Sequence, residues 1–184
     1  PSRGLGDVYK RQVIYSSLTG NTKQVAEAIT SVLPAGTPCV SMKELPSDLS
    51  SYDLVFAGFW VDKGTANKEA RDVLGTLHNP HIALFATAGV PPQMAHAKES
   101  LINAANCLPD GVEPVGTFIC QGKVDPKVIE MMYKMFPKGH SHGQSADRDA
   151  RHKQAAVHPN EDDFKAAQDF AQHILCLLYT SPSP

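Results

Sequence analysis

Two short and almost uninterrupted apolar runs lie near the middle of this chain, at residues 54–59 and 82–86. A strand with one wet face alternates apolar and polar side chains, whereas a strand covered on both faces is apolar throughout. Both runs are therefore predicted to be strands that are buried on both faces. Such strands are typical of a parallel sheet with helices on either side.

The rest of the chain alternates between strand-like and helix-like segments. Further strands are predicted at residues 13–16, 39–42 and 115–120. Apolar residues at helical spacing predict helices at 22–33, 66–77, 95–107 and 160–175, the last capped by Asn160. This alternation predicts an α/β fold in which a five-stranded parallel sheet forms a doubly wound, three-layer sandwich. Ligands of such sheets lie beyond the carboxyl ends of the strands.

Length and composition fit one globular domain, which we place at residues 13–178 of the 184. No apolar run is long enough to span a membrane, and a formal charge of −2 does not indicate the basic surface that binds nucleic acid. The four cysteines lie far apart, without the spacing of a disulfide framework or zinc site, so a cytoplasmic location is expected. Residues 1–12 and 176–184 resemble translated adaptor sequence, although genuine flexible termini would also fit.

A cluster of hydroxyl residues follows the first predicted strand directly and precedes the first predicted helix. A helix N-terminus offers unpaired N–H groups and the positive end of its dipole to an anion. Glycine allows close approach of the backbone, and hydroxyls add donors. We interpret the segment as a phosphate-binding loop, with a capped strand-to-helix turn as the alternative. Its residues are Ser17, Leu18, Thr19, Gly20, Asn21 and Thr22.

The kind of phosphate follows from what this loop lacks. Asn21 stands where the nucleotide-triphosphate loop carries its lysine, and the dinucleotide glycine fingerprint is absent. A loop that binds through hydroxyls suits a terminal monophosphate. The pattern Ser/Thr-x-Thr-Gly-x-Thr resembles the phosphate loop of flavodoxins, which bind flavin mononucleotide (FMN). Residues 13–120 are similar to flavodoxins throughout.

Two further loops should meet the phosphate loop at the same edge of the sheet, at residues 60–65 and 87–93. Trp60, the only tryptophan, offers a flat face for stacking on a flavin ring, although it could equally be a rim residue of the core. Gly64 and Gly89 permit close approach of the backbone. The resemblance implies that one ring face is covered by Trp60, Val61, Asp62 and Gly64, and that the other side is lined by Thr87, Ala88 and Gly89.

The sequences at residues 58–65 and 116–123 resemble one branch of the flavodoxin family more closely. That branch is the small flavodoxin-like partner of bilirubin reductase in gut bacteria. Where a plain flavodoxin would pass into its last helix, residues 121–159 intervene, with helices predicted from Pro126 to about Met135 and from about Ser145. This segment carries seven basic and four acidic residues, or +3, against −4 for residues 13–120. We interpret it as a platform for a partner or substrate, or else as a cover for an exposed sheet edge or helix.

Histidines at 140, 142, 152 and 158 could suggest a metal site, but cysteine or carboxylate ligands at fixed spacing are missing, so no metal is expected. Met131, Met132 and Met135 are expected to be packing residues. No catalytic residue is predicted. The first functional hypothesis is an FMN-binding electron carrier that supplies a reductase partner. The alternatives are an FMN-dependent NAD(P)H oxidoreductase acting itself on a quinone or tetrapyrrole, and a phosphate-loop module without flavin.

Overall fold

The computed structural model describes residues 9–141 and 143–180. Strands and helices alternate along the chain, as the sequence predicts. The strands are β1 (Arg11–Tyr15), β2 (Cys39–Ser41), β3 (Leu54–Asp62), β4 (Thr65–Ala66), β5 (His81–Ala88) and β6 (Gly116–Gln121). The helices are α1 (Asn21–Ser31), the short 3-10 helix η1 (Met42–Glu44), α2 (Lys68–Leu74), α3 (Ala95–Ala105), α4 (Pro126–Met135), α5 (Ala146–Ala155) and α6 (Glu161–Thr180).

Five of the strands form a parallel sheet in the order β2-β1-β3-β5-β6. Strand β1 pairs on both sides: Val13 lies opposite Cys39 of β2 and Phe56 of β3. The order of the strands therefore reverses between β1 and β3, which is the switch point of a doubly wound sheet. The predicted α/β fold class and its five-stranded parallel sheet are confirmed.

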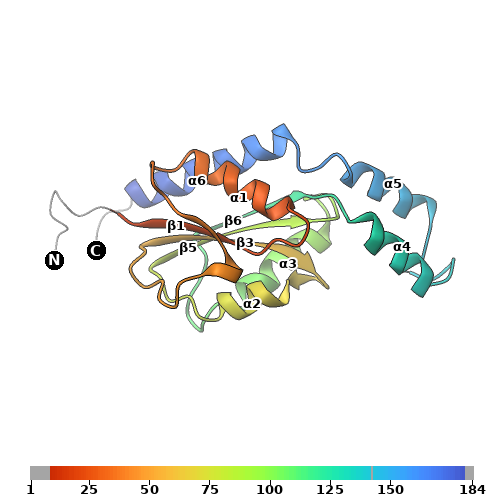
Figure 1. Ribbon diagram of the computed structural model, residues 1–184, viewed down its shortest axis with the longest axis horizontal. Helices are drawn as coiled ribbons and strands as arrows, with labels where there is room; N and C mark the ends of the chain where they lie inside the picture. Colours follow the sequence, from red (N-terminus) through yellow and green to blue (C-terminus); the bar gives the residue numbers. More distant parts are fainter. Residues whose placement is uncertain (1–8, 142, 181–184) are drawn as a thin grey trace.

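Helices cover both faces of this sheet and complete the three predicted layers (Figure 1). On one face, Ile29 of α1 and Ile174 of α6 pack with Phe56 of β3 in one core cluster. On the other face, Leu74 of α2 and Ala104 of α3 belong to a second cluster. The side chains of β3 and β5 are shared between the two clusters, because successive side chains of a strand point to opposite faces of the sheet.

The short strand β4 was not predicted. It runs antiparallel to the end of β3, and Asp62 lies opposite Thr65. The two residues between them, Lys63 and Gly64, both have positive φ, at 52° and 80°. Two positive φ angles in a two-residue connection are the geometry of a type I′ hairpin, which favours glycine. Residues 60–65 therefore form a hairpin and not the open loop that the sequence suggested.

The ends of the described chain extend two predicted elements. Strand β1 begins at Arg11 rather than at residue 13, so its first two residues belong to the segment 1–12 that the sequence analysis sets aside. Helix α6 runs past residue 175 to Thr180 and includes part of the other such segment. Residues 1–8 and 181–184 lie outside the described residues. No described helix is both long enough and apolar enough to cross a membrane.

Helices α4 and α5 form the helical addition predicted within residues 121–159, and they extend beyond the carboxyl edge of the sheet (Figure 1). Their predicted starts are confirmed by capping: the Asp125 side chain accepts from Lys127 N, and Ser145 accepts from Arg148 N. Helix α6 begins with a reciprocal capping pair. Asn160 Oδ1 accepts from Asp163 N, while Asp163 Oδ2 accepts from Asn160 N.

Candidate functional site

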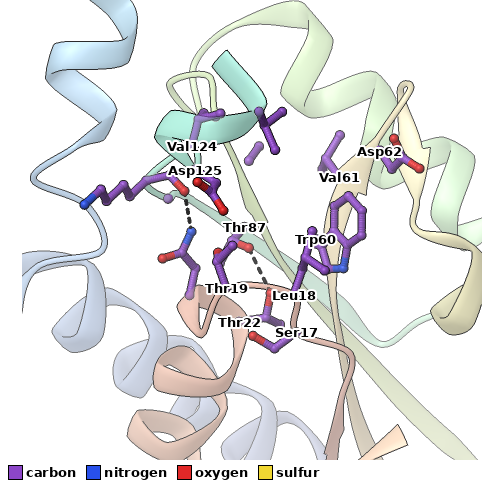
Figure 2. Close-up of a pocket in the computed structure, with 16 residues that line it drawn as sticks. Ser17, Leu18, Thr19, Thr22, Trp60, Val61, Asp62, Thr87, Val124 and Asp125 are labelled. Carbon is purple, nitrogen blue, oxygen red and sulfur yellow. Dashed lines mark hydrogen bonds between the residues drawn. The ribbon is translucent and has the colours of Figure 1, made fainter. Parts of the chain in front are cut away.

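A cavity of about 230 Å³ opens at the carboxyl edge of the sheet, beside the switch point (Figure 2). The three predicted loops meet there. Of the thirteen residues that the sequence analysis names, the structure brings eleven into the wall of this cavity, and Gly20 and Gly64 lie outside it. The eleven are Ser17, Leu18, Thr19, Asn21, Thr22, Trp60, Val61, Asp62, Thr87, Ala88 and Gly89.

The phosphate loop at residues 17–22 owes its shape to Gly20. This residue is the N-cap of α1 and has a φ of 99°, in the left-handed region where a side chain is strained. Ser17 Oγ accepts from Gly20 N at 3.1 Å and from Lys23 N at 3.3 Å. Gly20 thus shapes the loop without lining the cavity, and the N-terminus of α1 begins at the cavity wall.

The two predicted threonine donors differ in their surroundings. Thr19 is exposed at the cavity, whereas Thr22 is buried and its hydroxyl hydrogen-bonds the hydroxyl of buried Thr87 at 2.9 Å (Figure 2). This bond joins the phosphate loop to the end of β5. Thr22 therefore holds two loops of the site together, in addition to lining the cavity.

A buried polar network, which the sequence does not predict, supports the Trp60 side of the cavity. Asn67 Oδ1 accepts from Trp60 N at 3.3 Å, and Asn67 Nδ2 donates to Ser16 Oγ at 2.7 Å. The Ser16 hydroxyl in turn donates to Glu69 Oε1 at 2.6 Å. The network fixes the end of β3 against the start of the phosphate loop. More than 50 positions separate Ser16 from its two partners, so no sequence spacing could signal it.

A fourth wall, which was also missed, comes from the start of the helical addition. Gly122, Lys123, Val124, Asp125 and Val128 line the cavity opposite the Trp60 side. The available signal was the position of this segment directly after β6, since the carboxyl ends of parallel strands share one edge.

Close packing joins this fourth wall to the predicted loops. A Cβ on Gly89 would lie 2.7 Å from Val124 Cγ2, and one on Gly122 would lie 2.8 Å from Asn21 Nδ2. The same Asn21 nitrogen donates to the Lys123 carbonyl at 2.8 Å (Figure 2). A side chain at either position would force the side chain of Val124 or Asn21 to shift.

Gly64 has a different role from the one predicted. It occupies the type I′ turn between β3 and β4, where its positive φ excludes most other residues, and it does not line the cavity. Its carbonyl accepts from Asn103 Nδ2 of α3 at 2.7 Å. Gly64 therefore anchors the hairpin that carries Trp60 and Asp62 rather than approaching the ligand.

The chemistry of the wall suits a ligand with an anionic end and a flat apolar end. Hydroxyls and the helix N-terminus gather on the α1 side, while Trp60, Val61, Val124 and Val128 supply apolar surface. Asp62 and Asp125 add carboxylates, and none of the histidines and cysteines within residues 9–141 and 143–180 lines the cavity. FMN, with one phosphate and one planar ring system, fits this donor set. The volume is smaller than the roughly 300–1,000 Å³ of a typical ligand pocket, so part of such a ligand would face solvent.

Two other predictions concern the helical addition. Among residues 9–141 and 143–180, no group of three or more His, Cys, Asp or Glu residues could hold a metal ion, and His142 lies outside that range. The prediction that Met131, Met132 and Met135 pack against neighbours is wrong in part. None of the ten residues of α4 is buried, and Met131 and Met135 are largely exposed.

Comparisons with known proteins agree with this geometry. The Flavodoxin domain family matches residues 12–172. The chain is 34% identical over 173 residues to the flavodoxin-like domain-containing protein BilS of Clostridioides difficile (strain CD3), covering 90% of this chain and 96% of that protein. It is also 34% identical over 178 residues to the BilS protein of Clostridium symbiosum (strain WAL-14163), covering 88% of this chain and 93% of the relative.

The range of the family match extends across residues 121–159, which hold the helical addition. Among solved structures, a flavodoxin of Streptococcus pneumoniae TIGR4 superposes with a TM-score of 0.53 at 14% identity, covering 91% of this chain and 98% of that one. This likeness shows the fold. With a family match over most of its length and close relatives of the same extent, the chain belongs to the flavodoxin family.

Proposed function

We propose that this protein is an electron carrier, which holds FMN non-covalently and delivers electrons to a reductase that acts on bilirubin or a related tetrapyrrole. The observation that carries the proposal is the convergence of four loops on one cavity, with hydroxyl donors on one side and an indole on the other. The relatives named BilS support the choice of a bilirubin reductase as the electron acceptor.

The cofactor is FMN, and its phosphate would be held by Ser17, Thr19, Asn21 and Thr22 at the N-terminus of α1. When bound, FMN supplies chemistry in one-electron and two-electron steps. The remaining lining residues would bind the ring system: Trp60, Val61 and Asp62 on one side, and Thr87, Ala88 and Gly89 on the other.

The protein's own contribution is to hold the ring and to set its electrostatic surroundings. Asp62 and Asp125 place two carboxylates at the cavity wall, and among the residues that the structure describes Lys123 is the only basic one that lines it. Carboxylates beside a site oppose the addition of negative charge there. This arrangement makes a reduced cofactor a better electron donor, which suits a carrier that supplies a reductase.

A second function is supported by the helical addition at the mouth of the cavity. An FMN-dependent oxidoreductase would take hydride from NAD(P)H and reduce a quinone or tetrapyrrole itself. Helices α4 and α5 would then form a substrate site instead of a surface for a partner protein. NADPH consumption by the purified, FMN-loaded protein distinguishes the two functions, because a carrier oxidises no NADPH without a partner.

The proposal is tested by cofactor binding. The apoprotein should bind FMN and turn yellow, and riboflavin should bind much more weakly because it lacks the phosphate. Bound FMN should quench most of the fluorescence of Trp60, the only tryptophan in the chain. Equal affinities for FMN and riboflavin would contradict the phosphate site, and unquenched fluorescence in a fully loaded protein would contradict the placement of the ring beside Trp60.

A further inference from the structure

One face of α4 is apolar and exposed. Val128, Met131 and Met135 lie at i, i+3 and i+7 and so form one stripe along the helix, and they are 46%, 61% and 68% exposed. We name these three residues the α4 stripe. Three large apolar side chains in one row differ from the scattered exposed apolar residues of an ordinary surface.

The opposite side of α4 is the one that contacts α5. Tyr133 lies about 160° around the helix from Met131, given 100° per residue. Its hydroxyl donates to Asp149 Oδ1 at 3.0 Å and hydrogen-bonds His152 Nδ1 at the same distance. Because α5 attaches to α4 through the Tyr133 side, the α4 stripe is turned away from the rest of the helical addition.

The stripe is continuous with the candidate cofactor site. Val128 belongs both to the stripe and to the wall of the cavity. Leu18, which also lines the cavity, is 66% exposed. Exposed apolar surface therefore begins at the cavity and continues along α4 for about 10 Å beyond it, at 1.5 Å per residue from Val128 to Met135.

Basic residues border this surface. Lys127 and Lys134 are both exposed and lie at i and i+7 next to Met131, along one edge of the stripe, and Lys134 Nζ pairs with Glu130 Oε1 at 3.1 Å. The segment 121–159 has a charge of +3 and residues 13–120 have −4, so the positive charge is concentrated on the helical addition. An apolar row beside lysines fits a groove with an apolar floor and an acidic rim.

We infer that the α4 stripe is the docking surface for the electron-accepting reductase, whose complementary surface is an apolar groove bordered by acidic side chains. This inference rests on the proposed function and specifies its partner surface. Methionine suits the task, because its flexible, polarisable side chain adapts to the surface that it meets. Docking here places the partner against the cavity wall at Val128, and Lys127 with the net positive charge of residues 121–159 gives association that weakens as salt rises.

The test compares the wild type with Met131→Gln/Met135→Gln, each loaded with FMN and chemically reduced. Glutamine matches methionine in length and helix propensity, so α4 should be retained. The control is Ile102→Gln, since Ile102 on α3 is as exposed as Met131 at 61% but does not line the cavity. The probe is a purified bilirubin reductase, whose oxidation of the reduced carrier is followed by stopped-flow absorbance. FMN affinity is measured for every variant.

The double variant should need about tenfold more reductase for half-maximal rate, while its FMN affinity and the behaviour of Ile102→Gln stay unchanged. Equal rates for all three proteins would overturn the docking surface and leave the carrier function standing. No electron transfer from the wild type would overturn the carrier function and the docking surface together. A dimer of the wild type that the double substitution abolishes, seen by sedimentation, would assign the stripe to a second copy and overturn the reductase as its occupant.

Discussion

Replacing Asn67 by alanine should weaken the fold and the candidate cofactor site together. Asn67 is buried and makes two side-chain hydrogen bonds, one with Trp60 N and one with Ser16 Oγ. Each bond contributes about 1 kcal/mol, and leaving the Trp60 N–H without its acceptor adds a further penalty, so Asn67→Ala should lower the free energy of unfolding by about 2–3 kcal/mol. For a chain of this size, this corresponds to a fall in Tm of about 5–10 °C.

The control for this variant is Asn79→Ala. Asn79 is also buried and also makes two bonds, through Nδ2 to the carbonyls of Leu49 and Tyr52, but it precedes β5 at the opposite edge of the sheet. Both variants should lose stability in urea denaturation, whereas only Asn67→Ala should weaken FMN binding and reduce the quenching of Trp60. The reasoning is refuted if Asn67→Ala stays within about 0.5 kcal/mol of wild type, or if both variants lose the same FMN affinity.

Three further predictions follow from other contacts. Thr19→Ala should weaken FMN binding without changing stability, whereas Thr22→Ala should lower both the FMN affinity and the stability, because only Thr22 hydrogen-bonds Thr87 in the interior. Titration with FMN and thermal melts separate the two effects. Gln12→Leu should raise stability by about 1–2 kcal/mol in urea denaturation, since Gln12 is buried and its Oε1 has no hydrogen-bond partner among the described residues. Burial, with Arg148 close by, lowers the pKa of His152 below 6.5, so the neutral ring stabilises the α4–α5 pair above about pH 6.5, and this stabilisation is lost as pH falls through the folded-state pKa. Amide exchange in both helices, corrected for intrinsic rates, should therefore be faster at about pH 5.5 than at pH 7.5, and His152→Gln should remove the difference.

The sequence predicted the parts of the molecule whose physics is local. The runs at residues 54–59 and 82–86 are apolar because both faces of β3 and β5 are covered, and the phosphate loop is recognisable because a glycine and hydroxyls must stand where β1 turns into α1. The cap at Asn160 and the helix starts at Pro126 and near Ser145 are equally local and are confirmed. From these the fold class and most of the cavity wall could be predicted.

What the sequence could not predict depends on which segments meet in space. Asn67 lies inside the helix predicted at residues 66–77, and only the fold brings it to Ser16 and Trp60. Met131 and Met135 have the spacing of packing residues, but spacing shows that side chains share a face and not what covers it. The hairpin at β4 was missed because two residues of strand are too few for a periodic pattern, although Lys63-Gly64 carries the turn.

The hydrogen bond from Asn21 to the Lys123 carbonyl affects how protein without FMN would bind the reductase. Asn21 belongs to the phosphate loop and Lys123 lies three positions before the start of α4, so cofactor and partner would act on two ends of one contact. Linked binding equilibria are reciprocal. If bound phosphate orders Lys123 and thereby raises the affinity for the reductase, the docked reductase raises the affinity for the phosphate by the same factor. We therefore expect the reductase to select loaded carriers over empty ones, so that apoprotein competes poorly for the acceptor.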